Sequence, residues 1–295
     1  MDELIIPVIL LGTIGALGAV LLYLVSKKFF VKEDERLGKI IEALPGANCG
    51  GCGMAGCANF AEACLKVDSL ADLRCPVGGD EVMGKISAIL GKEAPSVEPM
   101  MAVVRCAGSC SVREKSNTYD GTKSCTIASA LYGGETGCPF GCLGFGDCLE
   151  VCELKAITIN PETKLPEIDE NKCGGCGSCV KVCPKGIIEL RNRDRNTGRV
   201  FVSCVNKEKG AVARRACKVA CIGCGKCAKI CPSGAIVIEN NLAYIDFRKC
   251  EKCGKCLLEC PTGAITTNNP SLREKCKAEE EMKKTMQSQS ILNKI

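Results

Sequence analysis

The sequence predicts an α+β chain in which small cysteine-rich domains follow one membrane-spanning helix. Three observations predict this: an uncharged apolar stretch near the start, 27 cysteines without a histidine among 295 residues, and a cysteine pattern that recurs along the chain. With only 4% aromatic residues, a large apolar core is not expected, so something else must hold these domains together. The lack of histidine excludes Ser-His-Asp and Cys-His catalysis, Cys2His2 zinc fingers and histidine-ligated haem, and no phosphate-cradling G-x-x-x-x-G-K-[ST] loop is present.

The first expected element is a helix that crosses a membrane. Leu4 to Val25 carries no charge, and as a helix it spans ~33 Å, about the thickness of the hydrocarbon core. A buried core helix and a cleaved signal peptide are the alternatives, but a signal peptide needs a basic start and this chain begins Met1-Asp2-Glu3. Because Lys27 and Lys28 follow the span, we expect residues 1–26 to be a single-pass anchor in the cell (inner) membrane, with the C-terminal bulk in the cytoplasm.

Residues 27–92 are predicted to form a small domain around a glycine-rich cysteine loop. Apolar spacing predicts one helix over Lys32–Leu44, ended by Pro45-Gly46, and another over Ala58–Leu70. Glycine lets the loop between them wrap closely around an ion or a cluster. The spacing C-x2-C-x4-C-x17-C supplies its four candidate ligands, Cys49, Cys52, Cys57 and Cys75. Cys64 lies on the second helix and is interpreted as a packing cysteine.

A linker with a first strand at Met101–Arg105 occupies residues 93–105 and leads to a repeated motif. This motif, C-x2-C-x2-C-x3-C-P, is the bacterial ferredoxin pattern, whose first three cysteines ligate one [4Fe–4S] cluster while the fourth ligates its neighbour. A zinc site would need two Cys-x2-Cys pairs and no third cysteine in phase, so iron–sulfur clusters are predicted. The motif occurs three times, at Cys173-Cys176-Cys179-Cys183, Cys221-Cys224-Cys227-Cys231 and Cys250-Cys253-Cys256-Cys260.

A fourth copy of the motif is degenerate. Gly141–Cys152 aligns with Ala220–Cys231, and Phe145 stands where Cys224 stands. The body is therefore interpreted as a duplication, with one bacterial-type two-cluster ferredoxin copy at 106–198, a second at 199–267 and a polar tail at 268–295. The upstream offsets repeat as well, with Cys125 and Cys138 matching Cys204 and Cys217.

Six clusters are expected from these motifs. The sixth is the least constrained, because unligated structural thiols are an alternative for its members. In the set that contains Phe145, Cys138 is expected to replace the missing ligand. The expected ligand sets are Cys49, Cys52, Cys57 and Cys75; Cys173, Cys176, Cys179 and Cys152; Cys138, Cys142, Cys148 and Cys183; Cys221, Cys224, Cys227 and Cys260; Cys250, Cys253, Cys256 and Cys231; and Cys106, Cys110, Cys204 and Cys217, with Cys125 in reserve and Cys64 and Cys276 unligated.

Short alternating runs predict strands after each fourth cysteine and before the next motif. A short helix is expected to end at each Cys-Pro step, and Asn240-Asn241 is expected to form a hairpin turn. The expected strands are Ile157–Asn160, Leu165–Asp169, Ile187–Arg191, Val200–Ser203, Ile236–Asn240 and Leu242–Asp246.

Several of these segments together resemble one family. They are the membrane helix, Pro-Gly-Ala-Asn-Cys-Gly-Gly-Cys-Gly at 45–53, Cys-Pro-Val-Gly-Gly-Asp at 75–80 and Gly-Cys-Leu-Gly-Phe-Gly-Asp-Cys at 141–148. Almost the whole chain resembles the long, multi-cluster type of the B subunit of the Rnf complex, a membrane ferredoxin:NAD+ oxidoreductase that couples electron flow to sodium or proton transport. The resemblance implies that the chain takes electrons from soluble ferredoxin and passes them to membrane subunits. Flavin, NAD and ion sites would then lie on partner subunits.

Two other functions remain open from the sequence. One is an electron-supply factor that keeps a redox-sensing regulator reduced, and the other is a structural metal-binding protein. No G-x-G-x-x-G motif opens a βαβ unit, and no catalytic residue or nucleic-acid partner is expected. A row of one-electron clusters without a substrate site favours conduction, as part of a translocating enzyme.

The second ferredoxin copy is basic. Residues 199–265 contain twelve Lys or Arg and five Asp or Glu, whereas residues 121–190 contain six and nine. Because ferredoxins are usually acidic, Lys249, Lys252 and Lys255 are expected to form the ferredoxin docking surface. The alternative is that these charges only balance their own clusters, each of which carries roughly −2.

Overall fold

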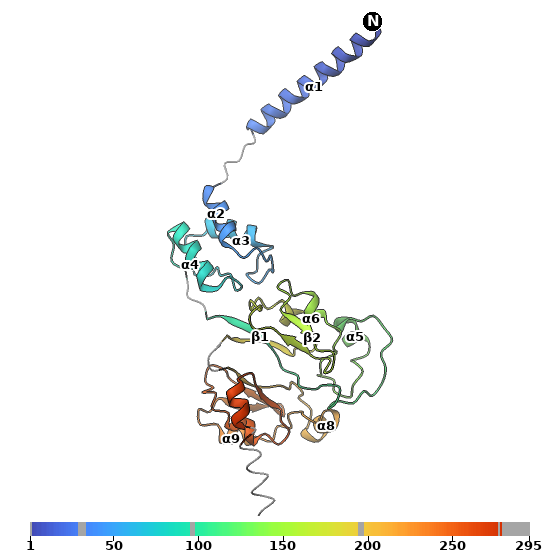
Figure 1. Cartoon of the computed structure of the whole chain (residues 1–295), viewed down its shortest axis with the longest axis vertical. Coiled ribbons are helices and arrows are strands. Elements are labelled where there is room, and N and C mark those ends of the chain that lie inside the picture. Colours follow the sequence, from blue (N-terminus) through green and yellow to red (C-terminus); the bar gives the residue numbers. More distant parts are fainter. Residues whose placement is uncertain (1, 29–33, 95–97, 194–197, 277, 279–295) are drawn as a thin grey trace, which may run out of the picture.

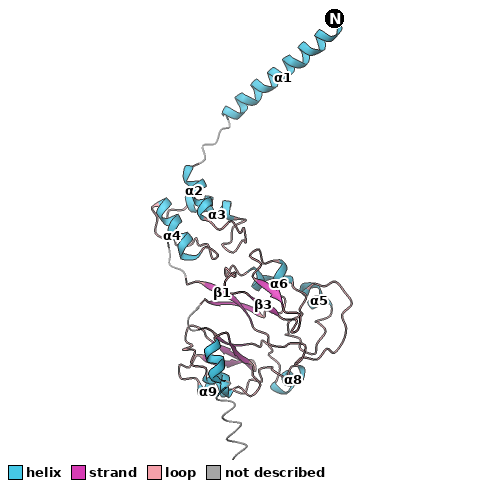
Figure 2. Cartoon of the chain, in the orientation of Figure 1, coloured by secondary structure: helices cyan, strands magenta, loops and turns pink. Residues whose placement is uncertain are grey.

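The computed structural model describes residues 2–28, 34–94, 98–193, 198–276 and 278, with side chains from Leu10 onward. Helix α1 (Asp2–Lys28), a helical unit and a body of small sheets follow one another along the long axis (Figure 1). We call the helical unit the N-terminal unit (residues 34–94). The body consists of a first lobe (98–193) and a second lobe (198–276), and Figure 2 shows short strands and helices in both.

Helix α1 is long and apolar enough to cross a membrane over Leu10–Lys28, and it is the one such helix among the described residues. Its large side chains face outward, and Leu17, for example, is 71% exposed. A helix that is apolar all round and unburied is suited to lipid rather than to a protein core. The expected span Leu4–Val25 lies within α1, although the side chains of residues 4–9 lie outside the described part.

The N-terminal unit packs three helices around an apolar core. They are α2 (Glu35–Ala43), α3 (Cys57–Lys66) and α4 (Gly79–Leu90). Ile40, Phe60 and Ile86, one from each helix, are at most 1% exposed. The two predicted helices are confirmed with shifted ends: the second stops at Lys66, and residues 32–33 of the first lie outside the described part.

Each lobe contains a hairpin and a second antiparallel strand pair. The first lobe comprises β1 (Met100–Val104), α5 (Cys125–Leu131), α6 (Asp147–Glu150), β2 (Ile157–Ile159), β3 (Pro166–Ile168), α7 (Ser178–Val182) and β4 (Ile188–Asn192). The second comprises β5 (Val200–Val202), α8 (Gly210–Ala216), α9 (Lys226–Ile230), β6 (Ile236–Glu239), β7 (Leu242–Ile245), α10 (Lys255–Glu259) and β8 (Ile265–Thr267). The pairs are β1 with β4, β2 with β3, β5 with β8 and β6 with β7.

The pairing register explains why these short strands persist. In the second lobe Ile236 lies opposite Ile245, and both are buried in an apolar cluster that also contains cysteines. The predicted hairpin turn is confirmed: Asn240 and Asn241 take φ of +48° and +61°, as a tight two-residue turn requires. All predicted strand positions are confirmed to within two residues, whereas the pairing of β1 with β4 and of β5 with β8 was not predicted.

Arg105 joins the two lobes. Its Nε donates to the Val202 carbonyl at 3.2 Å and its Nη2 to the Cys204 carbonyl at 3.3 Å, while Nη1 pairs with Glu189 at 3.2 Å. Its guanidinium also lies 5.1 Å from the centre of the Tyr244 ring. One side chain of the first lobe thus satisfies backbone acceptors of the second, which fixes the junction.

The N-terminal unit touches the first lobe at its cysteine loop. Ser178 Oγ donates to the Cys49 carbonyl at 3.3 Å. A Cβ atom on Gly51 would lie only 2.6 Å from Cys176 Cβ, so the two backbones approach as closely as they do because residue 51 has no side chain.

Candidate iron–sulfur centres

The N-terminal group consists of Cys49, Cys52, Cys57 and Cys75, which the structure brings together as expected. Cys57 opens α3, and its amide donates to Asn48 Oδ1 at 2.8 Å, which ties the ends of the loop. The Gly78 amide donates to Cys75 Sγ at 3.3 Å. Burial, and then the charges of Cys57 and Cys52, raises the pKa of Cys75, as expected where several thiols face one another.

Cys64 lies in the apolar core of the N-terminal unit. It is fully buried beside Phe60 and Met83, and burial is the main cause that raises its pKa to about 11. A neutral thiol in such a place behaves as a small apolar side chain. Its position agrees with the packing role that the sequence suggests.

The Cys179 group gathers Cys152, Cys173, Cys176 and Cys179 around one hollow of the first lobe, the set expected from the motif. Burial, followed by the charges of Cys173 and Cys176, raises the pKa of Cys179 to about 12. The Ala156 amide donates to Cys152 Sγ at 3.3 Å. Cys49 of the N-terminal group lines the same hollow, so the two groups are neighbours.

The Cys148 group differs from the expected one. Cys142, Cys148 and Cys183 line a hollow with Cys125, and Cys138 lies elsewhere. Phe145, which occupies the position of the missing ligand, points to Tyr119 instead, with ring centres 5.6 Å apart.

Asp147 is the physical reason for this difference. Its carboxylate accepts hydrogen bonds from the amides of Cys125 and Thr126 at 2.6 and 2.9 Å and from the hydroxyls of Ser124 and Thr126 at 3.0 and 2.9 Å. It therefore holds the first turn of α5 against the motif loop, with Cys125 at the hollow. The sequence did contain a signal: at the position of Asp147 the other motif copies have Ser178, Lys226 and Lys255.

The Cys217 group lies where the two lobes meet and combines cysteines from both. Cys106, Cys138, Cys204 and Cys217 line its hollow, so Cys138 stands in place of the expected Cys110. Asn206 Nδ2 lies 3.6 Å from Cys138 Sγ. Cys110 is exposed, and its sulfur lies 3.7 Å from the Thr163 carbonyl.

The second lobe contains the remaining two expected groups. The Cys227 group, Cys221, Cys224, Cys227 and Cys260, lines one hollow. The Cys256 group adds Cys231, Cys250, Cys253 and Cys256: burial, followed by the charges of Cys250, Cys227, Cys253 and Cys231, raises the pKa of Cys256 to about 12. The Ala264 amide donates to Cys260 Sγ at 3.3 Å, matching the contact of Ala156 in the first lobe.

Left-handed backbone bends each motif loop around its hollow. Gly223 and Gly225 have φ of +64° and +73°, and a Cβ on Gly223 would lie 2.6 Å from the Asn241 carbonyl oxygen. In the last copy Lys252 takes the first of these positions, with φ of +56°, and its amide donates to Cys250 Sγ at 3.4 Å.

Comparison with known proteins gives matches along most of the chain. The family described as a 4Fe-4S dicluster domain matches residues 136–187 and 220–264, and a second family with that description matches residues 165–232. A family described as a putative Fe-S cluster matches residues 44–72, which include the first three cysteines of the N-terminal group.

Relatives that match most of the chain decide the family. The B subunit of the Na+-translocating ferredoxin:NAD+ oxidoreductase complex of Acetobacterium woodii is 42% identical over 252 residues, which cover 85% of this chain and 74% of the relative. The B subunit of the proton-translocating complex of Clostridium ljungdahlii is 38% identical, over 85% of this chain and 87% of the relative. The B subunit of the ion-translocating oxidoreductase complex of Methanosarcina acetivorans is also 38% identical, over 84% and 92%. The chain belongs to this B-subunit family.

In this B-subunit chain the six groups form a series in which each group neighbours the next. For each two neighbouring groups, one group contains a thiol whose pKa is raised mainly by burial and also by the charge of a thiol in the other group. The linked thiols are Cys49 and Cys176, Cys179 and Cys148, Cys142 and Cys106, Cys204 and Cys221, and Cys256 and Cys227. The line runs from the N-terminal unit through the first lobe and the junction to the second lobe.

The residues of this B-subunit chain fit [4Fe–4S] clusters. Four of the thiol groups each surround a small hollow. No three Cys, Asp, Glu or His side chains in the described part come as close as the ligands of one metal ion, whereas wider thiol groups suit a cluster of several irons. The buried Nε of Arg113, beside the Cys217 group, has no hydrogen-bond partner among the described residues, and an anionic cluster would supply one.

The candidate docking lysines of this B-subunit chain are not equivalent. Lys249 and Lys255 are exposed, as is Cys253 between them, whereas Lys252 is half-buried and lines a pocket. The exposed thiol brings the Cys256 group to the surface beside two cations.

Proposed function

We propose that this chain is the iron–sulfur electron-transfer subunit of a membrane-bound ferredoxin:NAD+ oxidoreductase that couples electron flow to Na+ or H+ translocation. The observation that carries the proposal is the unbroken line of six four-cysteine groups. A bound [4Fe–4S] cluster supplies a one-electron carrier whose potential the protein tunes. The work of this chain's own residues is to hold such carriers in order, close together and shielded from water.

The geometry supports a revised set of ligands for six clusters. Four sets stay as the motifs suggest. Cys125 replaces Cys138 in the Cys148 group, and Cys138 replaces Cys110 in the Cys217 group. Cys64, Cys110 and Cys276 remain outside the six sets.

We place ferredoxin at the second lobe and the membrane partners at the N-terminal unit. Exposed Cys224 and Cys253 bring two groups of the second lobe to the surface, and exposed Lys249 and Lys255 suit an acidic ferredoxin. The N-terminal group lies at the other end of the line, and only the short segment from Ser26 to Asn48 joins it to the membrane helix.

Helix α1 would hold the chain in the cell membrane by a single pass. Lys27 and Lys28 in its last turn favour a cytoplasmic position for the N-terminal unit and both lobes. The sites for NAD, flavin and the transported ion are assigned to partner subunits of the same complex.

The test is Cys52→Ala in the assembled complex, with Cys110→Ala as the matched control. In Cys52→Ala, ferredoxin should still reduce the clusters of the two lobes in rapid-mixing spectra, while reduction of the membrane subunits and of NAD+ stops. The variant should contain about four irons fewer per chain, and Cys110→Ala should match the wild type in both measurements. Normal onward transfer in Cys52→Ala would show that the N-terminal group is not the exit.

A further inference from the structure

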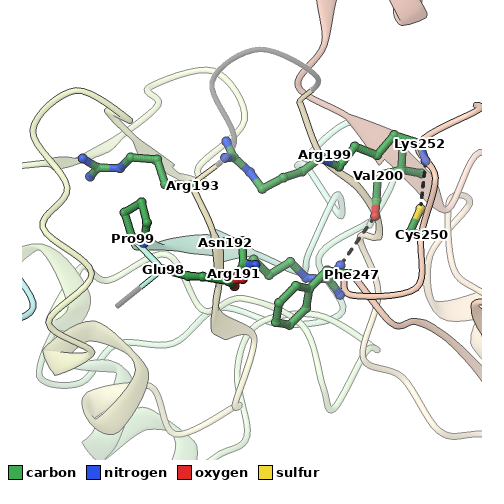
Figure 3. Close-up of a pocket in the computed structure, with 10 residues that line it drawn as sticks. All are labelled: Glu98, Pro99, Arg191, Asn192, Arg193, Arg199, Val200, Phe247, Cys250 and Lys252. Atoms are coloured by element: carbon green, nitrogen blue, oxygen red, sulfur yellow. Dashed lines mark hydrogen bonds between the residues drawn. The ribbon is translucent and has the colours of Figure 1, made fainter. Parts of the chain in front are cut away.

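A cavity of about 640 Å³ lies between the two lobes and borders the Cys256 group, because Cys250 lines it together with residues from both lobes. Arg191 and Arg193 come from the end of β4, Arg199 from the start of β5 and Phe247 from the loop after β7 (Figure 3). Cavities at domain junctions are the usual places for small-molecule ligands. This one is notable for its cations.

Arg191 is held rigidly at one wall of the cavity. Its side chain is 1% exposed, its Nε pairs with Glu189 at 2.5 Å, and its Nη1 donates to the Val200 carbonyl at 3.5 Å. The guanidinium lies beside the Phe247 ring, with 5.7 Å between the carbon and the ring centre (Figure 3). Its Nη2 is buried and has no hydrogen-bond partner among the described residues.

Arg199 and Arg193 add four more buried nitrogens of the same kind. The Arg199 side chain is 5% exposed and pairs through Nη2 with Glu170, but its Nε and Nη1 find no acceptor in the described part. The Nε and Nη2 of Arg193 find none there either. In Figure 3 the Arg199 side chain extends towards the strand that carries Arg193, whereas the guanidinium of Arg193 points away from Arg199 and Arg191.

Unpartnered charged donors in a low-dielectric site are destabilising, so these five nitrogens call for an acceptor. Glu170 pairs with Arg199, and Glu189 is shared between Arg191 and Arg105. Glu98 also lines the cavity, where its carboxylate accepts a hydrogen bond from Asn192, and no ion pair of Arg193 is found among the described residues. Guanidinium groups bind phosphate through paired N–H donors, and a phosphate offers enough oxygens for several of them at once. The cavity is also larger than a single carboxylate needs.

We propose that this junction cavity binds a small phosphate compound among the arginines that line it, Arg191, Arg193 and Arg199. Inorganic phosphate, pyrophosphate and a nucleotide share this chemistry. Because Arg191 and Arg193 belong to the first lobe and Arg199 to the second, the bound anion ties the two lobes together. This site does not depend on the electron-transfer role.

The experiment uses the full-length, cluster-reconstituted protein in detergent, titrated calorimetrically with inorganic phosphate, pyrophosphate or ADP. At least one of them should bind saturably and raise the thermal unfolding temperature. Arg193→Gln and, separately, Arg199→Lys should each weaken that binding at least about tenfold, because each variant loses a charge-assisted hydrogen bond to the phosphate compound. Arg248→Gln is the matched control, because Arg248 is exposed and contacts Phe247 without lining the cavity, and it should bind as the wild type does.

The three probes distinguish the sources of the phosphate group. Tightest binding of inorganic phosphate or pyrophosphate identifies a free anion, and tightest binding of ADP identifies a nucleotide. The proposal is overturned if none of the three binds saturably, if acetate binds as tightly as phosphate, or if Arg248→Gln weakens binding as much as Arg193→Gln. Binding of an oligoglutamate peptide without any phosphate compound would make the cavity a protein-docking site and would also overturn it. Iron content and circular dichroism establish that each variant is folded. Because two arginines are changed separately, the test still gives a result if one of the variants fails to fold.

Discussion

Arg113 places a buried cation between the Cys148 and Cys217 groups. It is 8% exposed, and a Cβ on Gly108 would lie 3.4 Å from its Nε and 3.5 Å from Cys217 Sγ. Its positive charge opposes the burial that raises the pKa of Cys142 and of Cys217. A cation this close also favours an added electron, so it should raise the reduction potential of clusters bound on either side.

Arg113→Leu should therefore lower the potential of one or two clusters by about 60 mV, the equivalent of tenfold in a one-electron equilibrium. Arg113→Lys keeps the charge and should restore most of the shift. Redox titration followed by electron paramagnetic resonance measures this, with Arg214→Leu on the exposed side of α8 as the control. Unchanged potentials in Arg113→Leu would show that the guanidinium is only structural.

Cys125 and Cys110 provide a second residue-scale test. Cys125→Ala should remove one cluster, about four irons per chain, because Cys125 lines the hollow of the Cys148 group. Cys110→Ala should leave the iron content unchanged, and so should Phe145→Cys, because the Phe145 ring packs on Tyr119. Iron and acid-labile sulfide per chain are measured in each variant. A Cys125→Ala protein with as much iron as the wild type would contradict the revised ligand set.

At the scale of elements, α5 depends on a carboxylate outside it. Burial alone would raise the pKa of Asp147, but hydrogen bonds from the amides of Thr126 and Cys125 and from the hydroxyls of Thr126 and Ser124 lower it to about 2. The ionised form therefore stabilises the docking of α5. Because the folded pKa lies below the ordinary value of 3.8, this contribution is complete above about pH 4 and is lost as the pH falls towards 2.

Asp147→Asn should destabilise the protein at pH 7 by about 2 kcal/mol, the free energy that corresponds to such a pKa shift. The difference from the wild type should shrink as the pH falls from about 4 to about 2. Thermal or denaturant unfolding measures it, with Asp120→Asn, an exposed carboxylate of the same lobe, as the control. Equal stability of Asp147→Asn and the wild type would mean that α5 is held by other contacts.

The elements also show what could be predicted from the sequence. Alternation and turn residues predict β2, β3, β6 and β7 because each hairpin forms between neighbouring segments. The motif spacing also predicts that Cys173, Cys176 and Cys179 lie together, because they are close to one another in the sequence. Cys125 and Cys138 were expected in other groups because their roles were inferred from the spacing of cysteines along the chain. That spacing does not reveal the hydrogen bonds from Cys125 and Thr126 to Asp147, which join residues about twenty positions apart. Three members of the Cys217 group, Cys106, Cys204 and Cys217, were expected together across the two copies, but Cys110 was expected where the structure has Cys138.

At the scale of the whole molecule, charge is unevenly distributed between the lobes. The excess of basic residues lies in the second lobe, where Lys249 and Lys255 flank exposed Cys253. Lys252 has a different role, since its left-handed backbone shapes the motif loop and its side chain lines the arginine cavity. A charge-reversal experiment on docking is cleaner without it.

Lys249→Glu with Lys255→Glu should slow ferredoxin-driven reduction about tenfold at low salt, because steered association depends on these charges. The rate should also fall less steeply as salt shortens the Debye length to ~8–10 Å. The matched control is Lys155→Glu with Lys181→Glu, two exposed lysines of the first lobe. Stopped-flow rates at several salt concentrations measure both variants, and equal slowing of the control would move the docking surface away from the second lobe.

Gly51 sets the gap between the N-terminal unit and the first lobe. Pro76 Cγ and Cys176 Cβ would lie 3.0 and 2.6 Å from any Cβ at this position, so even a methyl group would act as a wedge. Gly51→Ala changes no cysteine, but its methyl group would press on Cys176 and should lengthen the tunnelling distance between two neighbouring carriers. The chain therefore has a joint at which a single methyl group should slow electron transfer between two of its units.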